Sequence, residues 1–324
     1  MRKIILLSLF SSILVLIPSN SNSWGFWAHQ RINRMAVFTL PPQMVSFYKE
    51  NIEFITQHAV DPDKRRYSDP NEAPHHYIDL DRYDEFPFDS VPRRWDDAVA
   101  KYGEDTLNRH GMVPWYIQLE LYRLTDAFSE KSKWKILHYS ADIGHYIGDA
   151  HVPLHCTSNY NGQLTNQVGI HGLWESRIPE LFGNDYDYFV GKAEYLEHPS
   201  DKIWDVVLQS NAAVDSVLSA EKTLSEKFPS DQKFTFEQRG IKAVRTYSKV
   251  FSMEYQAMLN NMEQRRMRAA IICLGSFWYT AWVNAGKPDL GELKDDPVSP
   301  DKQNELEEMD KAWRDGKIIG RPEE

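Results

Sequence analysis

Apolar residues recur at intervals of three and four along most of the chain, a spacing typical of amphipathic helices. The pattern predicts helices over the following ranges: 29–40, 43–60, 93–107, 113–128, 133–150, 201–228 and 240–286. Pro41 and Pro42 separate the first two, and Gly286 and Pro288 close the last. Because no run between turn signals alternates apolar and polar positions, we expect no sheet. The sequence therefore predicts an all-α protein, with one multi-helix domain over residues 24–286.

Two segments lack this periodicity. Residues 61–91 are rich in Pro, Asp and Arg and read as a long ordered loop, a feature that is usually functional in a compact domain. Residues 287–324 are polar, acidic and contain prolines, so we expect a loosely attached tail there.

The first 23 residues have the pattern of a secretory signal peptide. Arg2 and Lys3 precede a short apolar run, and the small residues Ser21 and Ser23 come just before Trp24. A retained membrane anchor is less favoured, because serines interrupt the run and it is short for a membrane span. We expect a secreted or periplasmic protein whose mature chain begins at Trp24, with no stable membrane insertion and no protein partner.

Charge and cysteine content narrow the chemistry. A formal net charge of −10 argues against a protein that binds polyanions through counterion release, but not against a nuclease whose metal ions supply positive charge locally. Cys156 and Cys273 are the only cysteines, and the sequence leaves their pairing open. Two cysteines are too few for a thiolate zinc site, which leaves imidazole and carboxylate as candidate ligands.

Histidines and acids are concentrated in the middle of the chain. His145 and Asp149 are four residues apart, so on a helix they share one face, and His155 follows in the next turn. His171 and Glu175 repeat the same spacing on a second short predicted helix. One such pair is more often a salt bridge or a core histidine, but two pairs around His155 form the nitrogen and oxygen set that zinc prefers.

Other candidate ligands lie nearer the amino terminus. A free Trp24 amine and the Trp24 carbonyl could close a five-membered chelate on a metal, and His29 is near enough to join it. Asp61, within HAVDPDKRRY, and His76, within PHHYID, lie in the predicted loop. Taken singly, each of these residues is more often an ordinary core or loop residue.

Together these segments resemble a known superfamily. They occur in the order WGFWAH, then Asp61 followed after fourteen residues by HYID, then HYIGDAHVPLH, then HGLWE. This arrangement resembles that of the zinc-dependent phospholipases C and the single-strand-specific zinc nucleases. The resemblance implies an all-helical secreted enzyme that holds three zinc ions in a cleft between helices, with the mature N-terminal Trp as a ligand.

The resemblance also implies a ligand set and a reaction. The implied ligands are Asp61, His76, His145 and Asp149 for one zinc; Trp24, His29 and Asp149 for a second; and His155, His171 and Glu175 for the third. From metal chemistry we hypothesise that a hydroxide shared by the two zinc ions that Asp149 bridges attacks phosphorus in line, with Asp61 orienting it. The third zinc would then meet the leaving group or a non-bridging oxygen. The expected activity is hydrolysis of a phosphodiester.

The substrate stays open between phospholipid and single-stranded DNA or RNA. Lys64, Tyr77 and Asp79 look like the nucleases' contacts with phosphate and base, although ordinary loop polarity explains Lys64 and Asp79 about equally well. Glu175 and the short interval before His171 look like the phospholipases instead. A rival prediction is a zinc-binding structural or storage protein, in which closed four-ligand sites hold helices together without catalysis.

Overall fold

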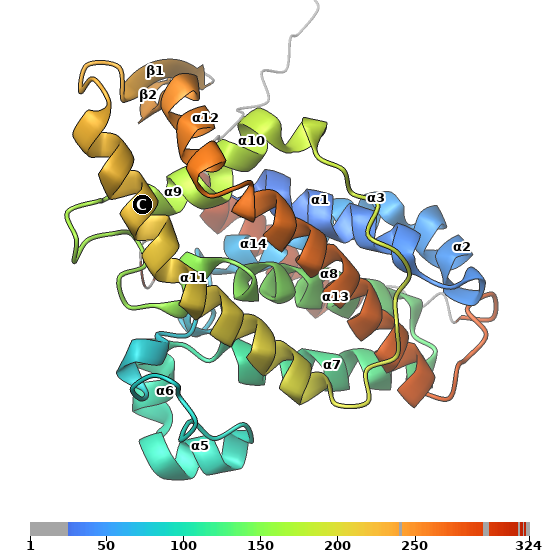
Figure 1. Ribbon diagram of the computed structural model, residues 1–324. Coiled ribbons are helices and arrows are strands. Elements are labelled where there is room, and N and C mark those ends of the chain that lie inside the picture. The colour runs from blue at the N-terminus through green and yellow to red at the C-terminus, as the bar shows by residue number, and fades with distance from the viewer. Residues whose placement is uncertain (1–24, 240–241, 294–297, 317, 320, 322–324) are drawn as a thin grey trace, which may run out of the picture.

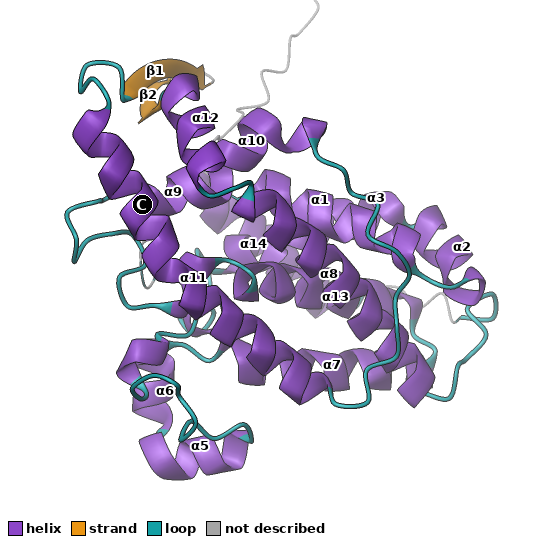
Figure 2. Ribbon diagram, viewed as in Figure 1, coloured by secondary structure: helices purple, strands orange, loops and turns teal. Residues whose placement is uncertain are grey.

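The computed structural model describes residues 25–239, 242–293, 298–316, 318, 319 and 321 (Figure 1). The predicted signal peptide and Trp24 lie outside these residues. The described chain is mostly helical, as the periodicity predicts, with one small two-stranded sheet (Figure 2). Within it, none of the helices combines the length and the apolar character needed to cross a membrane.

The elements follow one another in this order: α1 Phe26–Ala36, α2 Pro42–Glu50, α3 Ile52–Gln57, α4 Asp61–Arg65, α5 Trp95–Tyr102, α6 Glu104–His110, α7 Val113–Glu130, α8 Lys133–Ala150, α9 Ile170–Gly172, α10 Ile178–Phe182, α11 Pro199–Lys227, β1 Phe234–Arg239, β2 Lys242–Tyr247, α12 Lys249–Met258, α13 Met262–Asn284 and α14 Pro300–Asp315. Short 3₁₀ turns join several of them, and a π-helical turn, Leu173–Arg177, connects α9 to α10.

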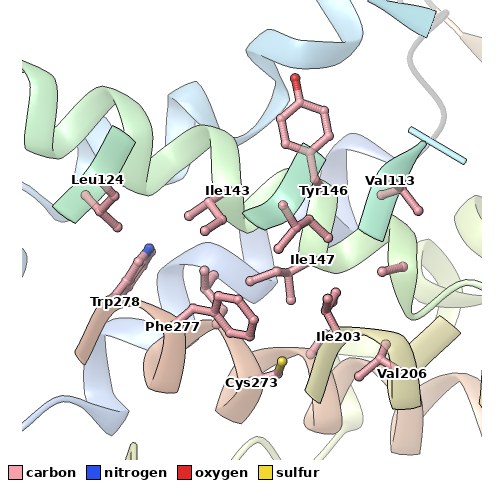
Figure 3. Packing of buried hydrophobic residues seen from close by; sticks show 14 of the residues in the cluster. Val113, Leu124, Ile143, Tyr146, Ile147, Ile203, Val206, Cys273, Phe277 and Trp278 are labelled. Carbon is pink, nitrogen blue, oxygen red and sulfur yellow. The ribbon is translucent and has the colours of Figure 1, made fainter. Parts of the chain in front are cut away.

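Helix α8 is the centre of the fold. It packs against α7, α13, α1 and α3, and nearly all of its side chains are buried. Figure 3 shows Ile143 and Ile147 of α8 facing Phe277 of α13, with Ile203 of α11 beside them. Closely packed protein interiors resist displacement, so the backbone of α8 holds its functional side chains in fixed positions.

Two glycines let α1 approach α8 closely. A Cβ atom added to Gly144 would lie 2.1 Å from Oδ1 of Asn33, and one added to Gly148 would lie 2.9 Å from Nδ1 of His29. Both pairs are four residues apart on their own helices, so the contact runs along one face of each. Asn33 then donates a hydrogen bond to the carbonyl of Ala141, 3.0 Å away, which fixes the crossing and brings His29 onto α8.

The prediction of a single helix over 240–286 is wrong. Strands β1 and β2 pair antiparallel, with Phe234 opposite Tyr247, and the helix that follows is divided into α12 and α13 at Asn260 and Asn261, which have positive φ. Phe234 and Tyr247 pack with ring centroids 4.8 Å apart, and Tyr247 packs on Phe251 of α12. The hairpin is short, and apolar and polar residues alternate only partly along its strands. The predicted helix therefore includes the residues of β2.

Other boundaries also differ from the prediction. The helix expected over 43–60 is interrupted at Asn51, and the helix over 93–107 is interrupted at Gly103, which has a φ of 75°. The expected loop over 61–91 contains the one-turn helix α4.

Cys156 and Cys273 are buried free thiols, and burial raises the pKa of each to about 12.

The prediction of a loosely attached tail is wrong for Pro300–Asp315. This segment forms α14, which lies against α4. Leu306, Met309 and Trp313 recur at helical spacing, and Met309 is only 4% exposed. Because most residues of this segment are acidic or polar, the narrow apolar stripe was not recognised in the sequence.

We expect Gly144→Ala to destabilise the fold by about 1–3 kcal/mol, because the new methyl group overlaps buried Asn33. Alanine favours the helix over glycine by up to about 1 kcal/mol. A net loss of stability would therefore come from the overlap with Asn33. Urea unfolding measures the change, and Gly291→Ala, in an exposed loop, is the matched control. An unchanged or raised midpoint for Gly144→Ala would show that α1 and α8 can separate at little cost.

Candidate metal centre

Five histidines and three acids converge beside the buried part of α8. They come from distant parts of the sequence: His29 on α1, Asp63 on α4, His76 after a 3₁₀ turn, His145 and Asp149 on α8, His155 on the turn Pro153–Cys156, His171 on α9 and Glu175 on the π-helical turn. All of them are buried except Asp63, whose side chain is 16% exposed. The π-helical turn places Glu175 where it faces both His155 and His171.

These side chains form three groups in which the potential ligand atoms lie within 4.8 Å of one another. The groups are His29, His145 and Asp149; Asp63, His76 and His145; and His155, His171 and Glu175. Each group contains imidazole nitrogen and carboxylate oxygen, the donor set that suits zinc.

Asp149 lies where the groups meet. Its Oδ1 is 3.3 Å from Nε2 of His29, while its Oδ2 is 3.0 Å from Nδ1 of His76 and 3.3 Å from Nε2 of His145. The two oxygens of this single carboxylate therefore face different sets of imidazoles. This is the arrangement that a carboxylate bridging two metal ions requires.

Backbone carbonyls set the orientation of three of the rings. Nδ1 of His145 donates a hydrogen bond to the carbonyl of Ala59 at 2.9 Å, Nδ1 of His155 to that of His76 at 2.6 Å, and Nδ1 of His171 to that of Tyr160 at 3.0 Å. With the proton held on Nδ1, the lone pair of Nε2 points toward the acids. Metal-binding histidines in proteins are oriented in this way.

His76 is oriented by a carboxylate instead. Its Nε2 lies 3.2 Å from Oε1 of Glu72, and the hydroxyl of Tyr146 donates a hydrogen bond to the same oxygen. Arg65 lies 3.2 Å from the other oxygen of Glu72 and 2.8 Å from Asp142. This outer layer leaves Nδ1 of His76 facing Asp149.

Several imidazole nitrogens in the centre converge on one carboxylate. Nε2 of His171 lies 2.6 Å from Oε2 of Glu175, and Nε2 of His155 lies 3.3 Å from the same oxygen. Buried imidazole and carboxylate groups that converge in this way fit the donor set of a cation site. The residues present therefore fit a bound metal ion.

The protonation of the centre shows how strongly its groups interact. Burial opposes the charged forms, yet contact with the histidines holds the pKa of Asp149 and of Glu175 well below the usual range. Burial lowers the pKa of His76, but hydrogen bonds to Asp149 and Glu72 outweigh it and raise the value to about 9. The acids are thus ionised in the interior and need positive charge beside them, as either protons or metal ions.

Asp61 is not brought into this cluster. Its carboxylate lies 2.5 Å from Nδ1 of His58 and 3.2 Å from Nζ of Lys64. Asp61 and Asp63 are two residues apart on α4, so they point to opposite sides of the helix, and Asp63 lies 3.8 Å from His76 and 3.6 Å from His145. Asp63, and not Asp61, therefore lies among the imidazoles of the cluster.

Gly25 shows where the chain passes as it enters α1. A Cβ atom on Gly25 would lie 2.7 Å from Oε1 of Glu175, and its φ of 85° favours glycine. The backbone directly after Trp24 therefore runs along the edge of the third group. Trp24 itself, the remaining expected ligand, lies outside the described residues.

The three expected substrate-binding residues lie on one side of the centre. Nζ of Lys64 is 3.2 Å from Asp310 of α14. The guanidinium carbon of Arg321 lies 4.0 Å from the ring centroid of Tyr77, and its Nη1 donates a 2.7 Å hydrogen bond to Asp79. Two further residues here, Tyr160 and Arg321, have no signal in the sequence pattern. Glu72, by contrast, is four residues before His76, the spacing that marks the other pairs.

No protein-family model matches the sequence, and a search of curated proteins finds no match. The assignment of function therefore depends on the residues and their geometry.

We expect Asp63→Asn to lower bound zinc by about one ion per chain and Asp61→Asn to leave it unchanged, because of these two acids only Asp63 lies beside His76 and His145. Elemental analysis after gel filtration at fixed free zinc measures this, with circular dichroism as a check on folding. The opposite pattern would return the ligand role to Asp61.

Proposed function

We propose that this protein is an exported zinc-dependent phosphodiester hydrolase, with the helical fold of the phospholipase C and zinc nuclease superfamily and three zinc ions. The observation that carries the proposal is Asp149, whose two oxygens face separate sets of imidazoles beside a third donor group. The first two groups share His145, and Glu175 of the third lies 3.6 Å from His29 of the first, so bound ions would lie close together, as phosphodiester hydrolysis requires.

The chain's own residues supply position and charge. Bound zinc would acidify a water molecule and neutralise charge on the phosphoryl oxygens. Asp149 would hold two ions at a fixed separation, and the carbonyl-bound rings of His145, His155 and His171 would keep their lone pairs aimed at the ions. Asp61 would act through Lys64, which it fixes at the edge of the centre.

The geometry beside the centre favours a nucleic acid as the substrate. The rings of Tyr77 and Tyr160 lie on the guanidinium of Arg321, at 4.0 and 3.6 Å, and Asp79 accepts a hydrogen bond from it. A space that takes a flat group with N–H donors suits a nucleobase, which stacks on aromatic rings. The trimethylammonium of choline has no N–H group to donate to Asp79.

Two alternatives remain distinct from this proposal. A phospholipid substrate is favoured by Glu175, the residue at which the sequence resembles the phospholipases. A structural or storage role for zinc requires closed four-ligand sites, whereas the third group, His155, His171 and Glu175, offers three donors among the described residues.

We expect the zinc-loaded protein to hydrolyse bis-p-nitrophenyl phosphate, to lose this activity with a chelator and to regain it with zinc. Parallel assays on single-stranded DNA, RNA and phosphatidylcholine should show cleavage of the nucleic acids. Cleavage of phosphatidylcholine alone would reassign the substrate, and stable zinc without any hydrolysis would favour the structural role.

We also expect Asp149→Asn to reduce hydrolysis by at least ~100-fold, because a neutral amide cannot join two metal ions. Initial rates and zinc content measured on the same sample separate loss of metal from loss of turnover. Asp215→Asn, an exposed change on α11, is the matched control and should retain both. An active Asp149→Asn enzyme would remove Asp149 from the centre of the reaction.

A further inference from the structure

The side of the centre that carries Lys64, Tyr77 and Asp79 is covered by the chain's own residues 300–316, 318, 319 and 321, here called the covering segment. Its helix α14 places Trp313 against Phe26 of α1, with ring centroids 6.0 Å apart. Nζ of Lys64 lies 5.5 Å from the ring of Trp313 and 3.2 Å from Oδ1 of Asp310. The helix therefore lies over the cation expected to contact phosphate.

The residues after α14 extend the cover. The amide of Ile319 donates a 2.8 Å hydrogen bond to the carbonyl of Arg66, and the guanidinium of Arg66 donates one to the carbonyl of Arg321. These two bonds hold the chain along the segment that follows α4. They place the guanidinium of Arg321 between Tyr77 and Tyr160.

The contacts of the covering segment match the chemistry of the proposed substrate. Asp310 offers an anionic oxygen to Lys64, as a phosphate group would. Arg321 offers a flat group between two aromatic rings and N–H donors to Asp79, as a nucleobase would. Asp310 thus occupies the place proposed for phosphate, beside Lys64. Arg321 occupies the place proposed for the base, beside Tyr77 and Asp79.

Few buried groups attach the helix of the covering segment. Met309 is the one buried residue of α14, and Asp310 is 42% exposed. Partly exposed ion pairs stabilise a contact little, and elements with few buried contacts open at low free energy. The Arg321–Asp79 ion pair is more buried, with side chains 14% and 8% exposed, so a ligand that displaces the covering segment must replace this contact.

We propose that the covering segment is a built-in competitive inhibitor, which imitates substrate at Lys64, Tyr77 and Asp79 and must be displaced before substrate binds. This inference rests on the proposed function for the identity of the ligand. The apparent affinity for substrate is then the intrinsic affinity multiplied by the fraction of molecules in which the segment is displaced. The opposite possibility is that Arg321 helps to bind substrate, and it predicts changes of the opposite sign.

The test uses the full-length, zinc-loaded chain and 2′-deoxyguanosine 5′-monophosphate as the probe. Trp313→Ala combined with Arg321→Ala should bind the nucleotide at least tenfold more tightly than the unaltered protein and lower KM with little change in kcat. Gln303→Ala, exposed on the same helix, should change neither. Isothermal titration calorimetry and initial rates give the two values.

Hydrogen exchange on the unaltered protein supplies a measurement that needs neither variants nor turnover. Saturating nucleotide should increase amide exchange over 300–319, including the amide of Ile319, and leave α13 unchanged. Unchanged or weaker nucleotide binding by the double variant, or unaltered exchange over 300–319, would overturn the proposal. Displacement of the segment without hydrolysis of any phosphodiester would instead sustain this inference and refute the proposed function. Displacement by phosphocholine and not by the nucleotide would also overturn the proposal, because phosphocholine has no N–H group to replace that of Arg321 at Asp79.

Discussion

The structure depends on holding ionised carboxylates next to imidazoles inside a helical protein. Asp149 and Glu175 are buried with depressed pKa values, and removing such charges from water is favourable only where opposite charge is fixed beside them. The packing follows from this requirement. Helix α8 is enclosed on several sides, and the glycines of its α1-facing side admit His29 to within 3.3 Å of Asp149. The apolar core around Ile143 and Ile147 then keeps α8 in place.

Much of the fold and most of the centre can be predicted from sequence, because both depend on helical spacing. Four-residue intervals place His145 with Asp149 and His171 with Glu175, and the structure brings both pairs together. The helices expected over 113–128 and 133–150 occur almost as predicted, since long periodic runs fix their own register.

Two things could not be predicted from the sequence: how distant segments pack against one another, and which face of a short helix points toward the core. The choice between Asp61 and Asp63 depends on how a one-turn helix is rotated against α8, and both acids flank the same proline. The hairpin before α12 escaped because two strands of six residues give little alternation to detect. The docking of α14 on α4 escaped because three apolar residues in an acidic segment are a weak signal until a complementary surface is known.

One hydrogen bond described above links parts of the centre that would otherwise be separate. Nδ1 of His155 is bonded to the carbonyl of His76, and the amide of Ile78 in turn bonds to the carbonyl of His155. The second donor group, which contains His76, and the third, which contains His155, are therefore joined through a shared stretch of backbone. Ordering one group restrains the other, so if ions bind, the entropy lost with the first need not be lost again for the next. Stepwise loading in such a centre would be cooperative, with partly filled molecules scarce at equilibrium.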